Sequence, residues 1–429
     1  MTTITAPVTL PCGVTLANRL VKAAMTEGLA DAYNRATARH VRLYETWARS
    51  GVGLHLTGKV QIDRRHLERP GNVAIVGPQS PEQLAALKAW ASAVTRTGAQ
   101  IWMQISHAGR QTPKAVNATP DAPSAVPLRL PGGNFGKPKP LSEPAILDLI
   151  ARYAFVARTA RDCGFGGVQI HAAHGYLISQ FLSPISNQRR DALGGSLENR
   201  SRFLVEVLKA TRAAVGSDFP VAVKLNSADF QKGGFGHDEA LEVVRTLNGL
   251  KIDLLEISGG TYEQPRMVGL DGVLEPVHDT SVRASTAARE AYFLNYAESI
   301  AAVAQMPLMV TGGLRTLAGM NDALGSGKIA LLGIARPMCG DPVSPASLLQ
   351  KGESLPTYEK SLRLGPGWLG PNSPFSLIKM INAFGGQGWY YQQIMRMGDG
   401  LPPDLGMGLL TAFRRYQADE SAKARALKS

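Results

Sequence analysis

The sequence has very few cysteines. Its 429 residues contain three, Cys12, Cys163 and Cys339, and no two of them form a CxxC pair. Zinc knuckles and iron–sulfur clusters that depend on local cysteine motifs are therefore not expected. A small, odd number of cysteines spread along the chain is typical of a protein from a reducing compartment.

Long apolar runs are also missing. No stretch approaches the roughly 18 consecutive apolar residues that suggest a membrane-spanning helix. The first ten residues, MTTITAPVTL, lack the basic start and apolar centre of a signal peptide. We therefore expect a cytoplasmic protein without a membrane partner.

Basic residues outnumber acidic ones, but they do not cluster. Lys and Arg number 46 against 34 Asp and Glu, which gives a net charge of +12, and no run of five basic residues occurs. Such a balance favours anionic partners, among them nucleic acid and phosphorylated small molecules. Because the charge is scattered, an anionic cofactor explains it at least as well, and we expect no nucleic-acid partner.

Eight short apolar segments alternate with amphipathic ones, which predicts an α/β protein built as a (β/α)8 TIM barrel. The predicted strands are Leu20–Ala24, Leu54–Thr57, Ile101–Ile105, Val168–His171, Val221–Leu225, Asp253–Ile257, Leu308–Thr311 and Ile329–Gly333. The clearest predicted helices are Ser80–Val94, Glu143–Asp162, Leu197–Val215, Asp238–Leu250 and Ala287–Ala304. Ser80, with Pro81 next and Gln83 three residues on, has the pattern of a capping box.

The two ends of the chain fall outside this alternation. Val8–Leu10 and Val14–Leu16 predict a hairpin that caps the bottom of the barrel. The alternation stops near Ser347, so we divide the chain into a barrel, residues 1–346, and a C-terminal helical extension, residues 347–429. The extension is too small for a core of its own. We expect it to pack on the barrel or on a partner subunit, which favours a homo-oligomer.

A glycine motif in the extension does not indicate a dinucleotide site. Gly365, Gly367 and Gly370 have the spacing G-x-G-x-x-G. No strand precedes them and Pro366 interrupts them, so the structural context that the motif requires is missing.

Polar residues on predicted strands are more informative. Gln104 shares a face with Trp102, and Lys224 shares one with Ala222, because side chains alternate along a strand. An inward lysine needs a partner, since an unpaired buried charge is costly. Two interpretations stay open: a salt bridge with Glu256, or a ligand over the barrel mouth that contacts both Gln104 and Lys224.

His171, His174 and Tyr176 follow the fourth predicted strand, at the end where barrel enzymes keep their chemistry. No carboxylate or cysteine set completes a metal site around the two histidines, and we predict no metal. They are either a structural pair or two N–H donors for one carbonyl oxygen of a substrate. Tyr176 would then be a phenolic acid within reach of the same substrate.

Gly312 and Gly313 follow the seventh predicted strand, and Ala335 and Arg336 follow the eighth. Barrel enzymes often bind phosphate in these two loops, and glycines let the backbone approach a ligand closely. A tight turn beside a surface arginine is the alternative.

These motifs resemble the Old Yellow Enzyme family of FMN-dependent oxidoreductases, from about Val8 to Pro342. The most specific stretch is His171–Phe203, HAAHGYLISQFLSPISNQRRDALGGSLENRSRF. NRLVKAAMT, QISHAGRQ and VTGG agree with the family in type and order.

The resemblance implies that the barrel of residues 1–346 binds FMN across its mouth and takes hydride from NADH or NADPH. The implied FMN contacts are Ala23, Ala24, Met25, Thr26, Gly58, Gln104, Lys224, Gly312, Gly313, Ala335 and Arg336. His171 and His174 would bind the carbonyl of a small-molecule substrate, such as an enone or a quinone, and Tyr176 would donate a proton. Arginine is common in the family where this chain has Lys224, one branch has cysteine at Thr26, and Ala335 replaces a common glycine.

The expected function is NAD(P)H-dependent reduction of the carbon–carbon double bond of α,β-unsaturated carbonyl compounds. One alternative is a flavin-dependent dehydrogenase or demethylase on the same barrel. The other is a non-redox barrel that binds phosphate or nucleic acid.

Overall fold

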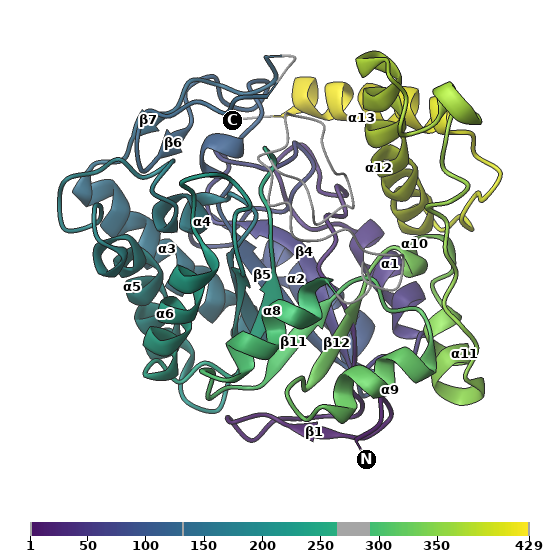
Figure 1. Ribbon diagram of the computed structural model, residues 1–429, viewed down its shortest axis with the longest axis horizontal. Coiled ribbons are helices and arrows are strands. Elements are labelled where there is room, and N and C mark those ends of the chain that lie inside the picture. Colours follow the sequence, from purple (N-terminus) through teal and green to yellow (C-terminus); the bar gives the residue numbers. More distant parts are fainter. Residues whose placement is uncertain (1, 131–132, 264–291, 428–429) are drawn as a thin grey trace.

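The computed structural model describes residues 2–130, 133–263 and 292–427. Eight parallel strands close into a barrel in the order β10-β11-β12-β3-β4-β5-β8-β9, with helices around it (Figure 1). The barrel strands are β3 Leu20–Lys22, β4 Leu54–Gln61, β5 Gln100–Ser106, β8 Gly167–Ala172, β9 Val221–Asn226, β10 Leu254–Ser258, β11 Leu308–Thr311 and β12 Leu331–Ile334. Each predicted strand overlaps one of them, so the predicted (β/α)8 barrel is confirmed.

The helices have local sequence signals at their ends. The Ser80 side chain accepts a hydrogen bond from Gln83 N, which confirms the predicted cap of α2. The Ser196 side chain caps α5, and Gly216 ends that helix with φ +85°. The helices are α1 Ala38–Ala48, α2 Pro81–Thr95, α3 Glu143–Asp162, α4 Leu177–Leu182, α5 Leu197–Val215, α6 His237–Asn248, α8 Tyr292–Ala301, α9 Leu317–Gly325, α10 Pro337–Gly340, α11 Ser344–Lys351, α12 Ser376–Gly398 and α13 Leu409–Ala426. Residues 287–291 of the helix predicted at Ala287–Ala304 lie outside the described ranges.

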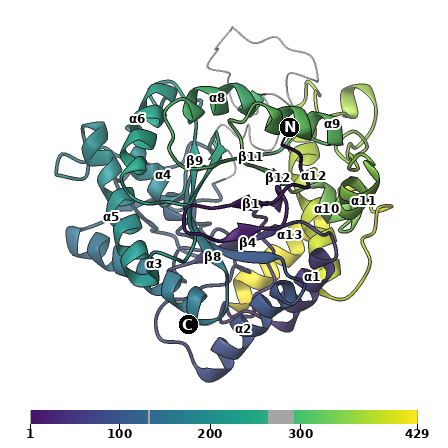
Figure 2. The same ribbon diagram turned by 90° about the horizontal axis from the view of Figure 1, so that it is seen from below.

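Short elements outside the barrel complete the fold. A hairpin of β1 Val8–Thr9 and β2 Thr15–Leu16 crosses the bottom of the barrel (Figure 2). Its Leu10 and Leu16 pack with inward residues such as Trp102, so the hairpin plugs that end as predicted. The long loop after β5 holds η1 Gly109–Gln111, β6 Asp121–Ala122 and β7 Lys139–Pro140. The glycine motif of the extension lies around a short 3-10 helix, η3 Gly367–Leu369. The element before η3 is the helix α11 and not a strand.

The C-terminal segment packs beside α1, and α12 and α13 lie against each other (Figure 1). Arg39 pairs with Asp399 at 2.7 Å, and Lys423 Nζ donates to the Gly28 carbonyl at 2.7 Å. A division at residue 346 falls inside α11, because Ser344–Lys351 is one continuous helix. The boundary between barrel and extension therefore stays a prediction.

Candidate active site

A chain of hydrogen bonds crosses the inside of the barrel. Gln104 Nε2 donates to Gln169 Oε1 at 2.7 Å, and Gln169 Nε2 donates to Glu256 Oε2 at 2.8 Å. The other carboxylate oxygen, Glu256 Oε1, accepts from Lys224 Nζ at 2.8 Å and from Thr311 Oγ1 at 2.7 Å. Lys224 therefore points inward, and the salt bridge with Glu256, one of the two interpretations left open by the sequence, is present.

One acceptor in this series of hydrogen bonds has no donor among the described residues. Gln104 is 1% exposed, and its Oε1 has no hydrogen-bond partner in the described part of the chain. A buried amide oxygen without a donor costs about 1–3 kcal/mol. A bound molecule with an N–H group at this level of the barrel would remove that cost.

The two histidines of the site are brought together at the end of β8. Their ring centroids are 5.0 Å apart, and the centroid of Tyr176 is 4.9 Å from that of His171. His174 has φ +61°, a conformation held by a hydrogen bond from its N–H to Asn226 Oδ1 at 3.1 Å. Its Nε2 lies 2.6 Å from Ser258 Oγ.

Both imidazoles are neutral at physiological pH. Burial, with a smaller contribution from Lys224, lowers the pKa of each histidine well below 6.5. His171 Nδ1 accepts the Ala173 N–H at 3.2 Å, so the remaining proton of that ring is on Nε2. A neutral imidazole can donate this N–H to a carbonyl oxygen without placing a full positive charge in the site.

Tyr176 takes part in a hydrogen-bonded series that the sequence did not predict. Its hydroxyl is 2.7 Å from the Tyr262 hydroxyl, which donates to Glu68 Oε1 at 3.1 Å. Lys59 Nζ lies 3.4 Å from the same carboxylate oxygen and 5.0 Å from the centroid of the Tyr176 ring. Burial, then the nearby Glu68 carboxylate, raises the pKa of Tyr176 well above 10.0, so its phenol is protonated.

The segment after β3 lies beside this series. Thr26 Oγ1 donates to Glu68 Oε2 at 3.1 Å and accepts from Lys59 Nζ at 2.9 Å. The N–H of Gly58 donates to Glu27 Oε1 at 2.7 Å, and a Cβ at Gly58 would collide with Glu27 and with the Met25 carbonyl. Packing against Glu27 thus explains this glycine without a ligand. Ala23 and Ala24, next in the chain to β3, pack with the cluster inside the barrel.

The loops after β11 and β12 have two of the features expected of a phosphate site. Gly312 and Gly313 have φ of +105° and +83°, a region that favours glycine, and a Cβ at Gly312 would meet nothing within 4 Å. Arg336, next to Ala335, pairs with Glu359 of the C-terminal extension at 3.0 Å, and Arg315 pairs with the same oxygen at 3.0 Å. Two guanidinium groups therefore converge where an anion was predicted, and a carboxylate of the chain contacts both.

Comparison with known proteins decides the family. The pattern of the NADH:flavin oxidoreductase / NADH oxidase family matches residues 4–353. This chain belongs to that family. It is a flavin oxidoreductase of the Old Yellow Enzyme type, with FMN as cofactor and NADH or NADPH as reductant.

Fungal and bacterial members are similar over most of the barrel. The chain is 36% identical over 361 residues to the NADH-dependent flavin oxidoreductase iliE of Hypocrea jecorina, with 80% of this chain and 88% of that protein covered. It is 37% identical to the iliE protein of a Neonectria species, with 79% of this chain covered, but spans only 46% of that protein's length. The solved Old Yellow Enzyme homologue of Zymomonas mobilis aligns with a TM-score of 0.67 and 26% identity, over 82% of this chain and 94% of that one.

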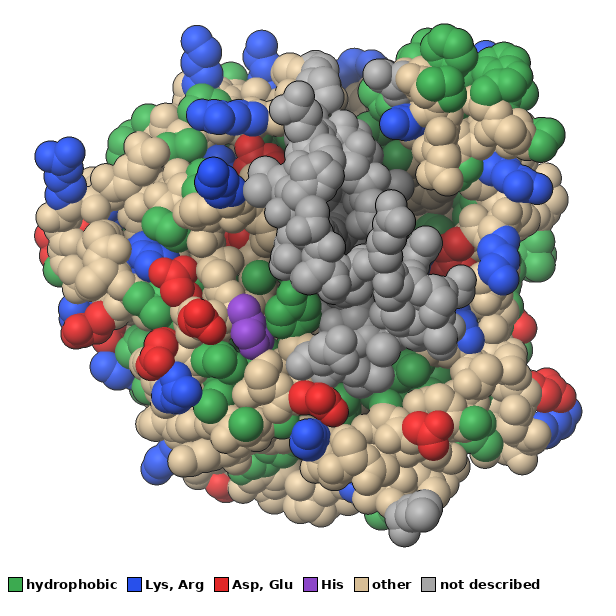
Figure 3. Space-filling view, viewed as in Figure 1, with side chains coloured by type: hydrophobic (Ala, Val, Ile, Leu, Met, Phe, Trp, Pro, Cys, Tyr) green, Lys and Arg blue, Asp and Glu red, His purple; other side chains and the backbone are tan. Residues whose placement is uncertain are grey.

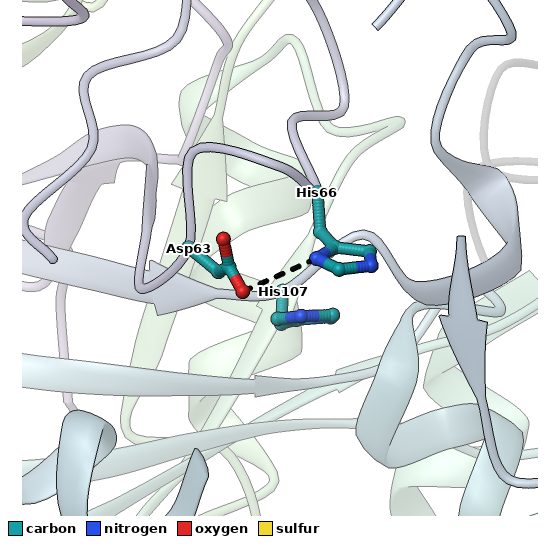
Figure 4. A group of neighbouring side chains, drawn as sticks. All are labelled: Asp63, His66 and His107. Carbon is teal, nitrogen blue, oxygen red and sulfur yellow. Dashed lines mark ion pairs between the residues drawn. The ribbon is translucent and has the colours of Figure 1, made fainter. Parts of the chain in front are cut away.

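A second group of buried histidines lies where β4 and β5 end. Asp63, His66 and His107 have potential ligand atoms within 4.8 Å of one another (Figure 4). Asp63 is already held by Arg65 at 2.7 Å, His66 Nε2 accepts the Asp121 N–H at 2.8 Å, and His107 Nδ1 accepts the Gly109 N–H at 3.1 Å. The bond between His66 and Asp121 ties the loops after β4 and β5 together.

The residues that sequence reasoning missed are Lys59, Glu68 and Tyr262. Lys59 lies on β4, beyond a bulge between Leu56 and Lys59, whereas the predicted strand ended at Thr57. A charged residue in an apolar strand was the signal that identified Lys224, and it would have identified Lys59 had the strand been extended. Glu68 and Tyr262 lie in loops and give no such signal.

Among the described residues no helix is long and apolar enough to cross a membrane.

Proposed function

We propose that this flavin oxidoreductase reduces the carbon–carbon double bond of α,β-unsaturated carbonyl compounds, or of related electron-poor alkenes. The observation that carries the proposal is the cluster of two neutral imidazoles and one protonated phenol at the end of β8. It offers two N–H donors for a carbonyl oxygen and one acid for a carbon next to it.

The residues present fit FMN. Gln104 has a buried acceptor without a partner among the described residues, the Lys224 cation lies on the inside of the barrel paired with Glu256, and a Cβ at Gly312 would meet nothing within 4 Å. We propose that Ala23, Ala24, Met25, Thr26, Gly58, Gln104 and Lys224 contact the ring system, and that Gly312, Gly313, Ala335 and Arg336 hold the phosphate. When bound, FMN would supply the hydride chemistry between NADH or NADPH and the alkene.

His171 and His174 then polarise the substrate. A carbonyl oxygen that accepts their N–H groups gains negative charge as hydride reaches the β-carbon, and fixed donors stabilise that charge. One such donor is worth about 10²–10³ in rate in other enzymes. Tyr176 protonates the α-carbon, and its raised pKa keeps the proton available until the charge develops.

The test is a visible spectrum of the purified protein, followed without oxygen by addition of NADH or NADPH and then 2-cyclohexen-1-one. Flavin bands that bleach and then return support the proposal. Bands that bleach and stay bleached would show that reduced nicotinamide reduces the flavin and that the enone does not reoxidise it, which would reject the enone as acceptor. Tyr176→Phe should keep the yellow colour and the bleaching step, yet slow the return of the bands with poor alkenes.

The dehydrogenase or demethylase alternative runs the flavin in the opposite direction, with an amine as electron donor. In the same cuvette it predicts that an amine bleaches the flavin bands while reduced nicotinamide does not.

We also propose that the protein is a homo-oligomer in which a second copy covers the outer face of the extension. Large exposed apolar side chains gather there, over α12 and α13 (Figure 3); they include Trp368, Phe375, Leu377, Met380, Phe384 and Leu410. An apolar face is complementary to itself across a twofold axis, which a face of one charge is not. Light scattering should show a dimer or higher assembly that Leu377→Glu with Phe384→Glu dissociates. Leu147→Glu, at an exposed leucine of α3, is the control.

A further inference from the structure

Tyr176 is buried and must recover the proton that it donates. Its side chain is 1% exposed, and its hydroxyl hydrogen-bonds to that of Tyr262. If Tyr176 donates a proton in each turnover, another group has to restore it. The inference therefore rests on the proposed function, in which Tyr176 is the acid.

Tyr262 lies between Tyr176 and a charged pair. Its hydroxyl is 2.7 Å from Tyr176 and 3.1 Å from Glu68 Oε1, and Glu68 lies 3.4 Å from Lys59 Nζ. Each of these distances is within the range of a hydrogen bond or a close ion pair. The Lys59 side chain is 14% exposed, more than the 4% of Glu68, so Lys59 is the end of the series nearest to water.

We propose that Tyr262, Glu68 and Lys59 form a proton relay that restores the proton of Tyr176 after each reduction. The Tyr176 phenolate, formed when the α-carbon takes its proton, takes a proton from Tyr262. Tyr262 takes one in turn from the Lys59 ammonium through the Glu68 carboxylate, and water re-protonates Lys59. One proton passes from solvent to the product, and no group in the relay is oxidised or reduced.

The charges around Glu68 suit a group that passes a proton without keeping it. Burial raises the pKa of this carboxyl, but the Lys59 and Arg69 cations and the hydrogen bonds from Thr26 and Tyr262 hold it below 4.5. Burial also lowers the pKa of Lys59 below 10.5, which makes the ammonium a better proton donor. Glu68 is thus ionised at rest and next to a source of protons.

The C-terminal extension holds the residue that follows Glu68. Arg69, next to Glu68, has its guanidinium carbon 3.8 Å from the Tyr391 ring centroid and 5.2 Å from that of Tyr416. Glu420 of α13 binds the same guanidinium with contacts of 2.7 and 3.1 Å. Burial, then Glu68, raises the pKa of both Tyr176 and Tyr262, and Tyr391 adds a smaller effect in the same direction. Two helices outside the barrel thus hold Arg69, the residue next to Glu68, in place.

The experiment compares the first turnover with later ones. Enzyme reduced in advance is mixed rapidly with 2-cyclohexen-1-one, and return of the flavin bands is timed; steady-state turnover and bleaching by nicotinamide are measured separately. Tyr262→Phe and Glu68→Gln should lower steady-state turnover about tenfold, a barrier change of about 1.4 kcal/mol, with a far smaller effect on the first return. In these variants the solvent deuterium isotope effect on steady-state turnover should rise, because proton recovery becomes limiting.

Tyr153→Phe is the matched control, because Tyr153 is fully buried and its hydroxyl has no partner among the described residues. Phenol binding to the oxidised enzyme, followed by its spectral change, checks that the site is intact in each variant. Steady-state turnover equal to wild type in both Tyr262→Phe and Glu68→Gln would overturn the relay. If Tyr262→Phe slows the return of the flavin bands in the first turnover as much as it slows steady-state turnover, Tyr262 is instead the acid itself. Wild type that is never reoxidised by the enone would reject the proposed function, a result distinct from both.

Discussion

Arg69 and Glu420 form a two-contact ion pair across 351 residues of sequence, with Nη2–Oε1 at 2.7 Å and Nε–Oε2 at 3.1 Å. Arg69 is 3% exposed at the side chain, and its Nη1 has no hydrogen-bond partner in the described ranges. The pair joins the loop after β4 to the last helix. It therefore connects the stability of the extension to the position of Glu68.

Glu420→Gln should lower the free energy of unfolding by about 3 kcal/mol, since it leaves a buried guanidinium without its counter-charge. Urea unfolding measures the loss. Glu45→Gln removes an exposed partner of Arg96 and should cost less than about 1 kcal/mol. Equal effects from the two substitutions would show that the Arg69 pair is no more than a surface contact.

His171→Ala with His174→Ala should weaken binding of a phenol to the oxidised enzyme by about 100-fold, about tenfold for each lost donor. Both histidines have pKa values well below 6.5, so they stay neutral between about pH 6 and 8. Binding by wild type should accordingly not change with imidazole protonation in that window. A spectral titration follows it, and full retention of the phenol-induced change in the double variant would refute the proposed clamp.

Glu359→Gln should slow the loss of FMN on dilution, and the expected gain in affinity is about tenfold. The carboxylate lies 3.0 Å from both Arg336 and Arg315, so it offsets part of the positive charge offered to a phosphate. Flavin fluorescence after dilution measures release, with Glu353→Gln, at an exposed glutamate, as control. Faster release would mean that Glu359 mainly orients Arg336.

Lys22→Met should stabilise the protein more at neutral than at alkaline pH. Lys22 is fully buried, and burial lowers its pKa from 10.5 to about 8. The folded state therefore holds fewer protons than the unfolded state between these values, and the stability of wild type rises with pH there. The free energy of unfolding of the variant minus that of wild type should fall by about 2 kcal/mol between about pH 7 and pH 10, as measured by urea unfolding. A pH-independent difference would contradict the shifted pKa.

Local patterns in the sequence predicted much of the fold. The α5 helix begins and ends at the predicted residues, Leu197 and Val215, because a serine cap, an apolar stripe and a glycine stop lie together in the chain. Alternation along a strand also predicted that Lys224 and Gln104 point inward. In both cases the deciding interactions join residues a few positions apart.

Tertiary structure decided how the site is completed. The strand that carries Lys59 continues past a bulge, which pairing with β5 stabilises and propensity does not reveal. Tyr262 meets Glu68 across 194 residues, and Glu420 meets Arg69 across 351. Periodicity reports only on neighbours along the chain, so contacts between loops and a distant helix could not be predicted from it. The sequence by itself determined the barrel, the family motifs and the histidine pair; only folding placed a carboxylate, a second tyrosine and the C-terminal helices around them.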